Sequence, residues 1–220
     1  LLDGVRCVVA PQRRKRQRVP VPTCAIVGYT NAGKSTLLNS LTGAEVLAAD
    51  KLFATLDATI RPLYPDTRPK VLMSDTVGFI KKLPHDLVAS FKSTLDEAAS
   101  ASLLLFVVDA SDPSFRSQLD VTRKVLAEVG ATEVPSLLVL NKRDRLGPDE
   151  LAALKAEYPD AFFLSTRNKE DLQALRERIM GYFESDMIDE ELRIPFTAQG
   201  VVAEIRAKMR ILSEDYDAEG

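Results

Sequence analysis

Residues 28–36 read GYTNAGKST and carry the strongest fold signal in the chain. They follow the apolar, β-rich run Thr23–Val27 and precede a helix-like segment that begins STLLNSL. The spacing G-x-x-x-x-G-K-S between a strand and a helix is typical of a phosphate-binding P-loop. Its glycines let successive backbone N–H groups point at a polyphosphate, and the helix N-terminus adds partial positive charge. The alternative interpretation is a glycine-rich turn that binds nothing.

In the P-loop interpretation, the Lys34 ammonium reaches the β- and γ-phosphates, and the Ser35 hydroxyl holds Mg²⁺. We therefore predict that Lys34 supports catalysis and that the whole loop contacts a nucleotide. The predicted contacts are Gly28, Tyr29, Thr30, Asn31, Ala32, Gly33, Lys34, Ser35 and Thr36.

Short apolar runs alternate with helix-length amphipathic segments after this loop, which indicates βαβ units. The fold class is α/β, with a mostly parallel six-stranded sheet and helices on both faces. Predicted strands are Thr23–Val27, Thr59–Leu63, Val71–Asp75, Leu103–Asp109, Ser136–Asn141 and Ala161–Leu164. Predicted helices lie near 34–41, 85–99, 114–129, 149–157 and 169–183.

The composition is that of an ordinary globular protein, with 220 residues, 45% hydrophobic and 28% charged. No apolar run approaches the length of a membrane span, and the two cysteines lack the number that a disulfide framework needs. We therefore expect a soluble protein of the cytoplasm. Its nucleotide-binding domain should cover 21–184, and 185–220 should be an incomplete C-terminal α+β domain, with a short strand ELRIPF, a helix Gln199–Arg210 and a strand start ILSEDY.

Positive charge is concentrated near the start of the chain, although the net charge is −3. Residues 1–20 contain six Lys and Arg against one Asp, and Arg13–Arg18 holds five of them. Such a cluster can follow a phosphate backbone, or it can be a solvated linker between Pro11 and Pro20. We interpret 1–20 as a basic linker.

The tetrapeptide Asn141, Lys142, Arg143 and Asp144 ends the fifth predicted strand. In such an N-K-x-D element, the Asp144 carboxylate accepts from N1–H and the exocyclic amine of guanine. Adenine would leave that acceptor unpaired, at a cost of about 1–3 kcal/mol. Lys142 would cover the base, and Asn141 would tie this loop to the P-loop. The motif therefore favours guanine over adenine nucleotides.

Two further segments fit a γ-phosphate switch. Asp75-Thr76-Val77-Gly78 ends the third predicted strand, so that Asp75 can bind Mg²⁺ through water and the Gly78 N–H can sense the γ-phosphate. In LFATLDAT, Thr55 could give its hydroxyl to Mg²⁺, with Thr59 as the alternative. Loops 47–59 and 76–86 are the predicted switches.

The pair Ser165-Thr166 ends the sixth predicted strand and could present backbone N–H groups to guanine O6. A solvated loop after a strand is the alternative for this pair.

With GYTNAGKST, FATLD, DTVGF, LPHDL and NKRD in order, the chain resembles the HflX-type GTPases, relatives of the Obg group among translation-factor-class P-loop GTPases. The resemblance covers about residues 20–220. It implies a cytoplasmic, Mg²⁺-dependent GTPase that binds the large ribosomal subunit and its rRNA, is stimulated by it, and helps to split stalled ribosomes. It also implies a larger N-terminal domain, of which 1–20 would be a remnant.

The resemblance carries over nucleotide contacts to the first switch and to the two downstream motifs, with Mg²⁺ at Ser35 and Thr55; Asp75 joins these metal residues by its place at the end of a strand. The residues concerned are Phe53, Ala54, Thr55, Leu56, Asp57, Asp75, Thr76, Val77, Gly78, Asn141, Lys142, Arg143 and Asp144. We expect a monomer, and we assign Lys34, Thr55 and Gly78 to catalysis.

Phe79 occupies the position after D-x-x-G, where many switches place a glutamine. Its ring can neither orient nor deprotonate water, so we predict slow intrinsic hydrolysis that a partner accelerates. Two alternatives are a module that holds GTP without significant hydrolysis and an ATP-using P-loop enzyme.

Asn31 and His85 each allow two interpretations. Asn31 resembles the Asn of potassium-activated GTPases, or it is a loop residue suited to the left-handed conformation. His85 is a candidate catalytic base, or it starts a helix.

Overall fold

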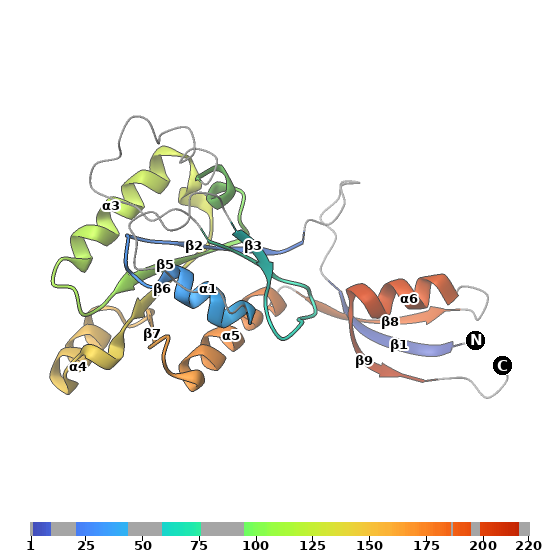
Figure 1. The fold of residues 1–220 in the computed structure, drawn as a ribbon. Coiled ribbons are helices and arrows are strands. Elements are labelled where there is room, and N and C mark those ends of the chain that lie inside the picture. The colour runs from blue at the N-terminus through green and yellow to red at the C-terminus, as the bar shows by residue number, and fades with distance from the viewer. Residues whose placement is uncertain are drawn as a thin grey trace. The chain divides into compact units, whose positions relative to one another are not determined.

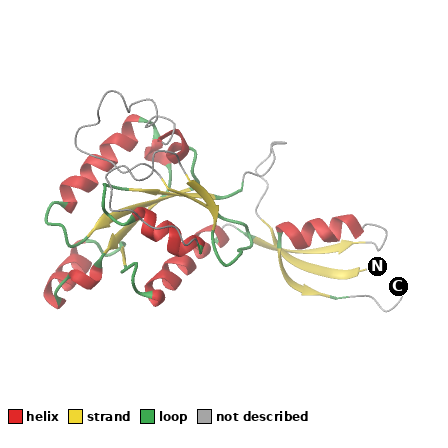
Figure 2. Ribbon diagram, in the orientation of Figure 1, coloured by secondary structure: helices red, strands yellow, loops and turns green. Residues whose placement is uncertain are grey.

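A computed structural model describes residues 2–9, 21–43, 59–75, 95–185, 187–194 and 199–215. These residues divide into two compact units. The larger unit comprises 23–65 and 72–177, and the smaller unit comprises 1–22, 66–71 and 178–220. Figure 1 shows the fold of each unit, and Figure 2 separates helices from strands by colour.

The larger unit contains a six-stranded sheet in the order β3-β4-β2-β5-β6-β7. Only β3 runs antiparallel to its neighbour, so the predicted α/β fold with a mostly parallel sheet is confirmed. The strands are β2 (Thr23–Val27), β3 (Thr59–Pro62), β4 (Leu72–Asp75), β5 (Leu103–Asp109), β6 (Ser136–Asn141) and β7 (Phe162–Phe163).

The helices of this unit also lie close to their predicted positions, and α3 lies on one side of the sheet with α1 and α5 on the other (Figure 1). Residues 95–99 are helical, and the earlier part of the predicted helix 85–99 lies outside the described residues. The helices are α1 (Lys34–Thr42), α3 (Phe115–Glu128), α4 (Pro148–Glu157) and α5 (Lys169–Glu184), with single turns η2 (Ala131–Glu133) and η3 (Arg143–Arg145). Residues 169–177 of α5 belong to this unit, and the rest of α5 belongs to the smaller one.

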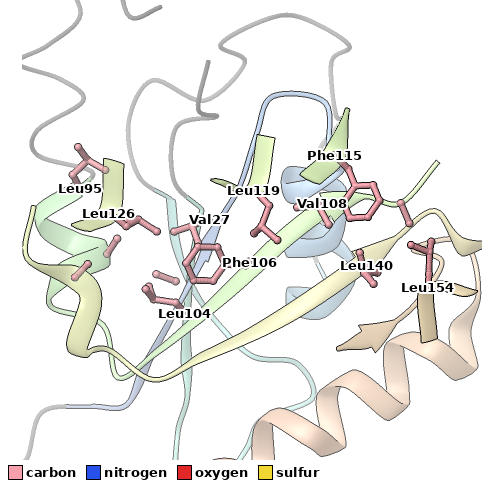
Figure 3. Close-up of a cluster of buried hydrophobic side chains, with 14 residues drawn as sticks. Val27, Leu95, Leu104, Phe106, Val108, Phe115, Leu119, Leu126, Leu140 and Leu154 are labelled. Carbon is pink, nitrogen blue, oxygen red and sulfur yellow. The ribbon is translucent and has the colours of Figure 1, made fainter. Parts of the chain in front are cut away.

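The strand β5 is buried along both faces, which explains its continuous apolar sequence. Because successive side chains alternate between faces, Leu104, Phe106 and Val108 share one side. There they join Leu119 and other side chains of α3 and neighbouring elements in the main core cluster (Figure 3). This packing fixes the carboxyl end of the sheet, where the predicted motifs lie.

The smaller unit contains an antiparallel sheet in the order β8-β1-β9, from β1 (Leu2–Val9), β8 (Ile188–Ile194) and β9 (Arg210–Glu214). The helix α6 (Gln199–Lys208) contributes Ile205, which packs with Ile194 in a second apolar cluster. The three C-terminal elements agree with the prediction except for shifts at their ends.

The interpretation of residues 1–20 as a linker is wrong for 2–9, which form the central strand β1. A strand is stable only with its partners, and the partners of β1 lie about 180 to 210 residues later in the sequence. The rest of the predicted linker, including Arg13–Arg18, lies outside the described residues. Among the helices that the structure describes, none is long and apolar enough to cross a membrane.

Candidate functional site: a nucleotide-binding edge of the sheet

The loop between β2 and α1 requires glycine at two positions because neighbouring strands approach it closely. Gly28 has φ +152°, and a Cβ there would lie 2.1 Å from the backbone oxygen of Val107 in β5. Gly33 has φ +94° at the N-terminus of α1, and its Cβ would lie 2.4 Å from the Asn141 side-chain nitrogen. The backbone therefore curls tightly over the carboxyl edge of β5 and β6, as a phosphate cradle requires.

Asn141 joins three of the predicted loops from the end of β6. Its side-chain nitrogen donates to the Ala32 carbonyl at 2.9 Å, and its side-chain oxygen accepts from the Thr166 N–H at 3.3 Å. The side chain is fully buried, so losing either partner would be costly. The expected tie between the N-K-x-D loop and the P-loop is thus present.

Lys142 adds a second tie. Its ammonium donates to the Asn31 carbonyl at 2.8 Å and to Asp109 Oδ2 at 2.7 Å. Asn31 has φ +61° and Lys142 has φ +62°, so both adopt the left-handed conformation. For Asn31, this is the conformation that one of our two interpretations expected.

Lys34 lies buried within the cradle at the start of α1. Its ammonium donates to the Tyr29 carbonyl at 2.9 Å. Burial lowers the pKa of Lys34 to about 8, and the nearby Asp75 carboxylate opposes part of that effect. A polyphosphate beside this ammonium would favour its charged form.

Ser35 and Asp75 bring two oxygen ligands together, since the Ser35 hydroxyl donates to Asp75 Oδ2 at 2.8 Å. Asp75 ends β4 beside the P-loop strand and is buried. Hard oxygen donors in this small number suit Mg²⁺, which usually binds one or two protein oxygens together with phosphates and water. In the part of the chain that the structure describes, no cluster of three or more His, Cys, Asp or Glu offers a different metal site.

Asp144 is exposed in η3 and lies next to a pocket of about 660 Å³. A hydrogen bond from the Ser165 side chain is the main cause that lowers the pKa of Asp144, so the carboxylate is ionised at neutral pH. The volume of this pocket is in the range of roughly 300–1,000 Å³ that is usual for small-molecule sites. The pocket is also lined by Arg143, Arg167, Asn168, Lys169 and Glu170.

Several predicted site residues lie outside the described residues, and their roles stay predictions. They are Phe53, Ala54, Thr55, Leu56, Asp57, Thr76, Val77, Gly78, Phe79 and His85. Thr59, the alternative to Thr55, begins β3.

Sequence reasoning missed Asp109 and Asp171. Asp109 is opposite Asn141 in the register of β5 and β6, and its carboxylate accepts a hydrogen bond from the Lys142 ammonium. One sequence feature could have indicated Asp109 as a site residue: it ends the predicted strand that lies beside the N-K-x-D strand. Asp171, in the first turn of α5, pairs with Arg143.

A P-loop at the carboxyl edge of a mostly parallel sheet, tied to an N-K-x-D loop, defines the class of GTPase-like P-loop proteins. A family model described as "50S ribosome-binding GTPase" matches residues 23–142, which is more than half of the chain. The chain therefore belongs to this family, and its relatives are of the HflX type.

Two curated relatives illustrate the match. The chain is 58% identical over 209 residues to GTPase HflX of Gluconacetobacter diazotrophicus, covering 95% of this chain and 46% of that protein. It is 44% identical over 189 residues to GTPase HflX of Escherichia coli, covering 83% of this chain and 43% of that protein. The chain thus spans about half the length of these relatives.

Solved structures give the same fold. A GTP-binding protein from the hyperthermophilic archaeon Sulfolobus solfataricus, in complex with GDP, is 31% identical with a TM-score of 0.55. The match covers 73% of this chain and 51% of that chain.

Proposed function

We propose that the chain is a GTP-binding and GTP-hydrolysing switch of the HflX type that acts on the large ribosomal subunit. The observation that carries the proposal is the double tie between loops, through Asn141 to Ala32 and through Lys142 to Asn31. These contacts join the phosphate-binding loop to the base-recognition loop. One nucleotide can then be held at both ends, with Asp144 selecting guanine.

The cradle supplies binding and charge. Lys34 places its ammonium against the β- and γ-phosphates, and backbone N–H groups from Gly28 to Ser35 surround them. Ser35 and Asp75 would hold Mg²⁺, together with Thr55 by family resemblance. Bound there, Mg²⁺ would neutralise charge on the phosphates.

Intrinsic hydrolysis is expected to be slow, because Phe79 cannot position the attacking water. The proposed accelerating partner is the large ribosomal subunit with its rRNA, which would place the protein in the cytoplasm, as a monomer in its free form. Potassium bound near Asn31 is a further proposed aid. The left-handed backbone of Asn31 also fits its other interpretation, as a loop residue suited to that conformation. A role of potassium in hydrolysis therefore needs a separate test.

Nucleotide titration with GDP, GTP and ATP tests the assignment directly. We expect guanine nucleotides to bind about 10- to 100-fold more tightly than ATP, since ATP leaves the Asp144 acceptor unpaired. Asp144→Ala should weaken GDP binding by about 10- to 100-fold. Asp149→Ala, at an exposed position in the first turn of α4, is the matched control and should bind GDP like the wild type.

Phosphate release then separates a switch from a passive GTP-binding module. We expect slow release from the chain alone and faster release with large ribosomal subunits. Equal affinity for GDP and ATP would instead support an ATP-using enzyme, and stimulated rates that are the same in KCl and NaCl would remove potassium from the mechanism.

A further inference from the structure

The Asp171 carboxylate connects two loops of the nucleotide site. Its Oδ2 accepts from Arg143 Nε at 2.6 Å and from the Ser165 backbone N–H at 2.7 Å. Its Oδ1 accepts from the second Arg143 nitrogen at 2.6 Å. Arg143 follows β6 and Ser165 follows β7, so one side chain from the first turn of α5 holds both loops.

This contact is partly buried and geometrically specific. The Asp171 side chain is 12% exposed and the Arg143 side chain 35% exposed. A bidentate pair between a guanidinium and a carboxylate fixes orientation as well as distance. The connection is reinforced by a backbone hydrogen bond from the Arg143 N–H to the Leu164 carbonyl at 3.1 Å.

Asp144 is linked to both groups that Asp171 holds. Arg143 precedes it in the chain, and the Ser165 side chain forms a hydrogen bond with its carboxylate. A shift of either group would therefore move the Asp144 oxygens relative to a bound base. Guanine presents two donors to these oxygens, so its binding depends strongly on where they lie.

We propose that Asp171 is a positioning residue for guanine selectivity, which acts through Arg143 and Ser165 on Asp144. This inference rests on the proposed function. The competing role is a structural one, in which the Asp171–Arg143 pair only attaches α5 to the sheet. The two roles differ in one measurable property, because a structural role would not depend on the 2-amino group of the base.

The test compares binding of GDP and inosine diphosphate, which lacks that amine, to the full chain and to Asp171→Asn. The Asn side chain keeps one oxygen for the Ser165 N–H but loses the charge and the second acceptor for Arg143. We expect the affinity for GDP to fall about tenfold and that for inosine diphosphate by less than about threefold. The ratio of the affinity for GDP to the affinity for inosine diphosphate should therefore be smaller in the variant than in the wild type.

Glu157→Gln is the matched control, because Glu157 forms a bidentate pair with Arg116 between α4 and α3, and no hydrogen bond or ion pair among the described residues joins it to the P-loop, the N-K-x-D loop or Ser165. It should leave both affinities unchanged. If Asp171→Asn fails to fold, as judged by circular dichroism, Arg143→Lys supplies the second test, since it keeps the charge but loses the planar fork.

An unchanged ratio in a folded Asp171→Asn or Arg143→Lys variant overturns the inference. Its failure is distinct from that of the proposed function. If the wild type binds GDP and ATP equally, the proposed function itself is wrong; if the wild type selects GDP and the variant keeps the full GDP-to-inosine ratio, only the role of Asp171 is wrong.

Discussion

Gly28 lies so close to the neighbouring strand β5 that no residue with a Cβ atom fits at this position. We predict that Gly28→Ala lowers the free energy of unfolding by about 2–4 kcal/mol, since its Cβ would overlap the Val107 backbone oxygen, which cannot rotate away. Gly181 in α5 has nothing within 4 Å of its Cβ position, so Gly181→Ala should raise stability by about 0.5–1 kcal/mol. Urea denaturation of both variants provides the comparison. A wild-type midpoint for Gly28→Ala would contradict the close approach.

Lys34 gives the free protein a pH-dependent stability. Its pKa falls from 10.5 to about 8 on folding, so below pH 8 the folded state carries a buried charge that costs about 3 kcal/mol. Between pH 8 and 10.5 the unfolded chain binds more protons than the folded one, and stability from this group therefore rises with pH.

The corresponding variant is Lys34→Met, measured by urea denaturation without nucleotide. We expect it to be more stable than the wild type at pH 7 by about 1–3 kcal/mol, and this advantage should shrink as the pH rises towards 10.5. The same advantage at pH 7 and pH 10 would show that desolvation of the Lys34 ammonium is not its cause.

At the level of elements, strands and helices with local signals were predicted well. The apolar run of β5 and the alternation of strand and helix in the larger unit follow from short-range patterns. β1 was missed because its structure depends on pairing with β8 and β9, far along the chain. The charges and prolines that follow β1 in the sequence favour a linker when only neighbouring residues are considered.

β1 should be essential for the smaller sheet, since it is the central strand. In the backbone register of the sheet, Arg6 lies opposite Glu191 of β8 on one side and Ser213 of β9 on the other. Arg6→Pro removes a backbone donor there and should abolish hydrogen-exchange protection in both outer strands. Arg6→Thr, with good β-propensity, is the control and should keep that protection.

GDP affinity in Arg6→Pro should stay within about twofold of the wild type, because the described site contacts lie in the larger unit. Persistent protection of β8 and β9 in this variant would show that β1 does not hold them.

For the whole molecule, motif spacing predicted which loops meet and the tie through Asn141, but not the supporting contacts of Asp109 and Asp171. The P-loop and the N-K-x-D loop were identified from residue types that phosphates and guanine need. Asp109 and Asp171 were not, because their roles arise from strand register and from the start of a helix, which bring distant residues together. These supporting contacts are three-dimensional and leave no fixed spacing in the sequence.

The central place of β1 between two late strands has a consequence for biosynthesis. Val9 pairs with Ile188, so a nascent chain must be extended by some 180 residues before this partner exists. At about 5–20 residues per second, that interval is roughly 10–35 s. Throughout it, both edges of the early segment are open to other extended peptides, while the larger unit, which ends at residue 177, is itself being synthesised. A chaperone that shields extended segments would thus protect this chain most before translation reaches its last strands.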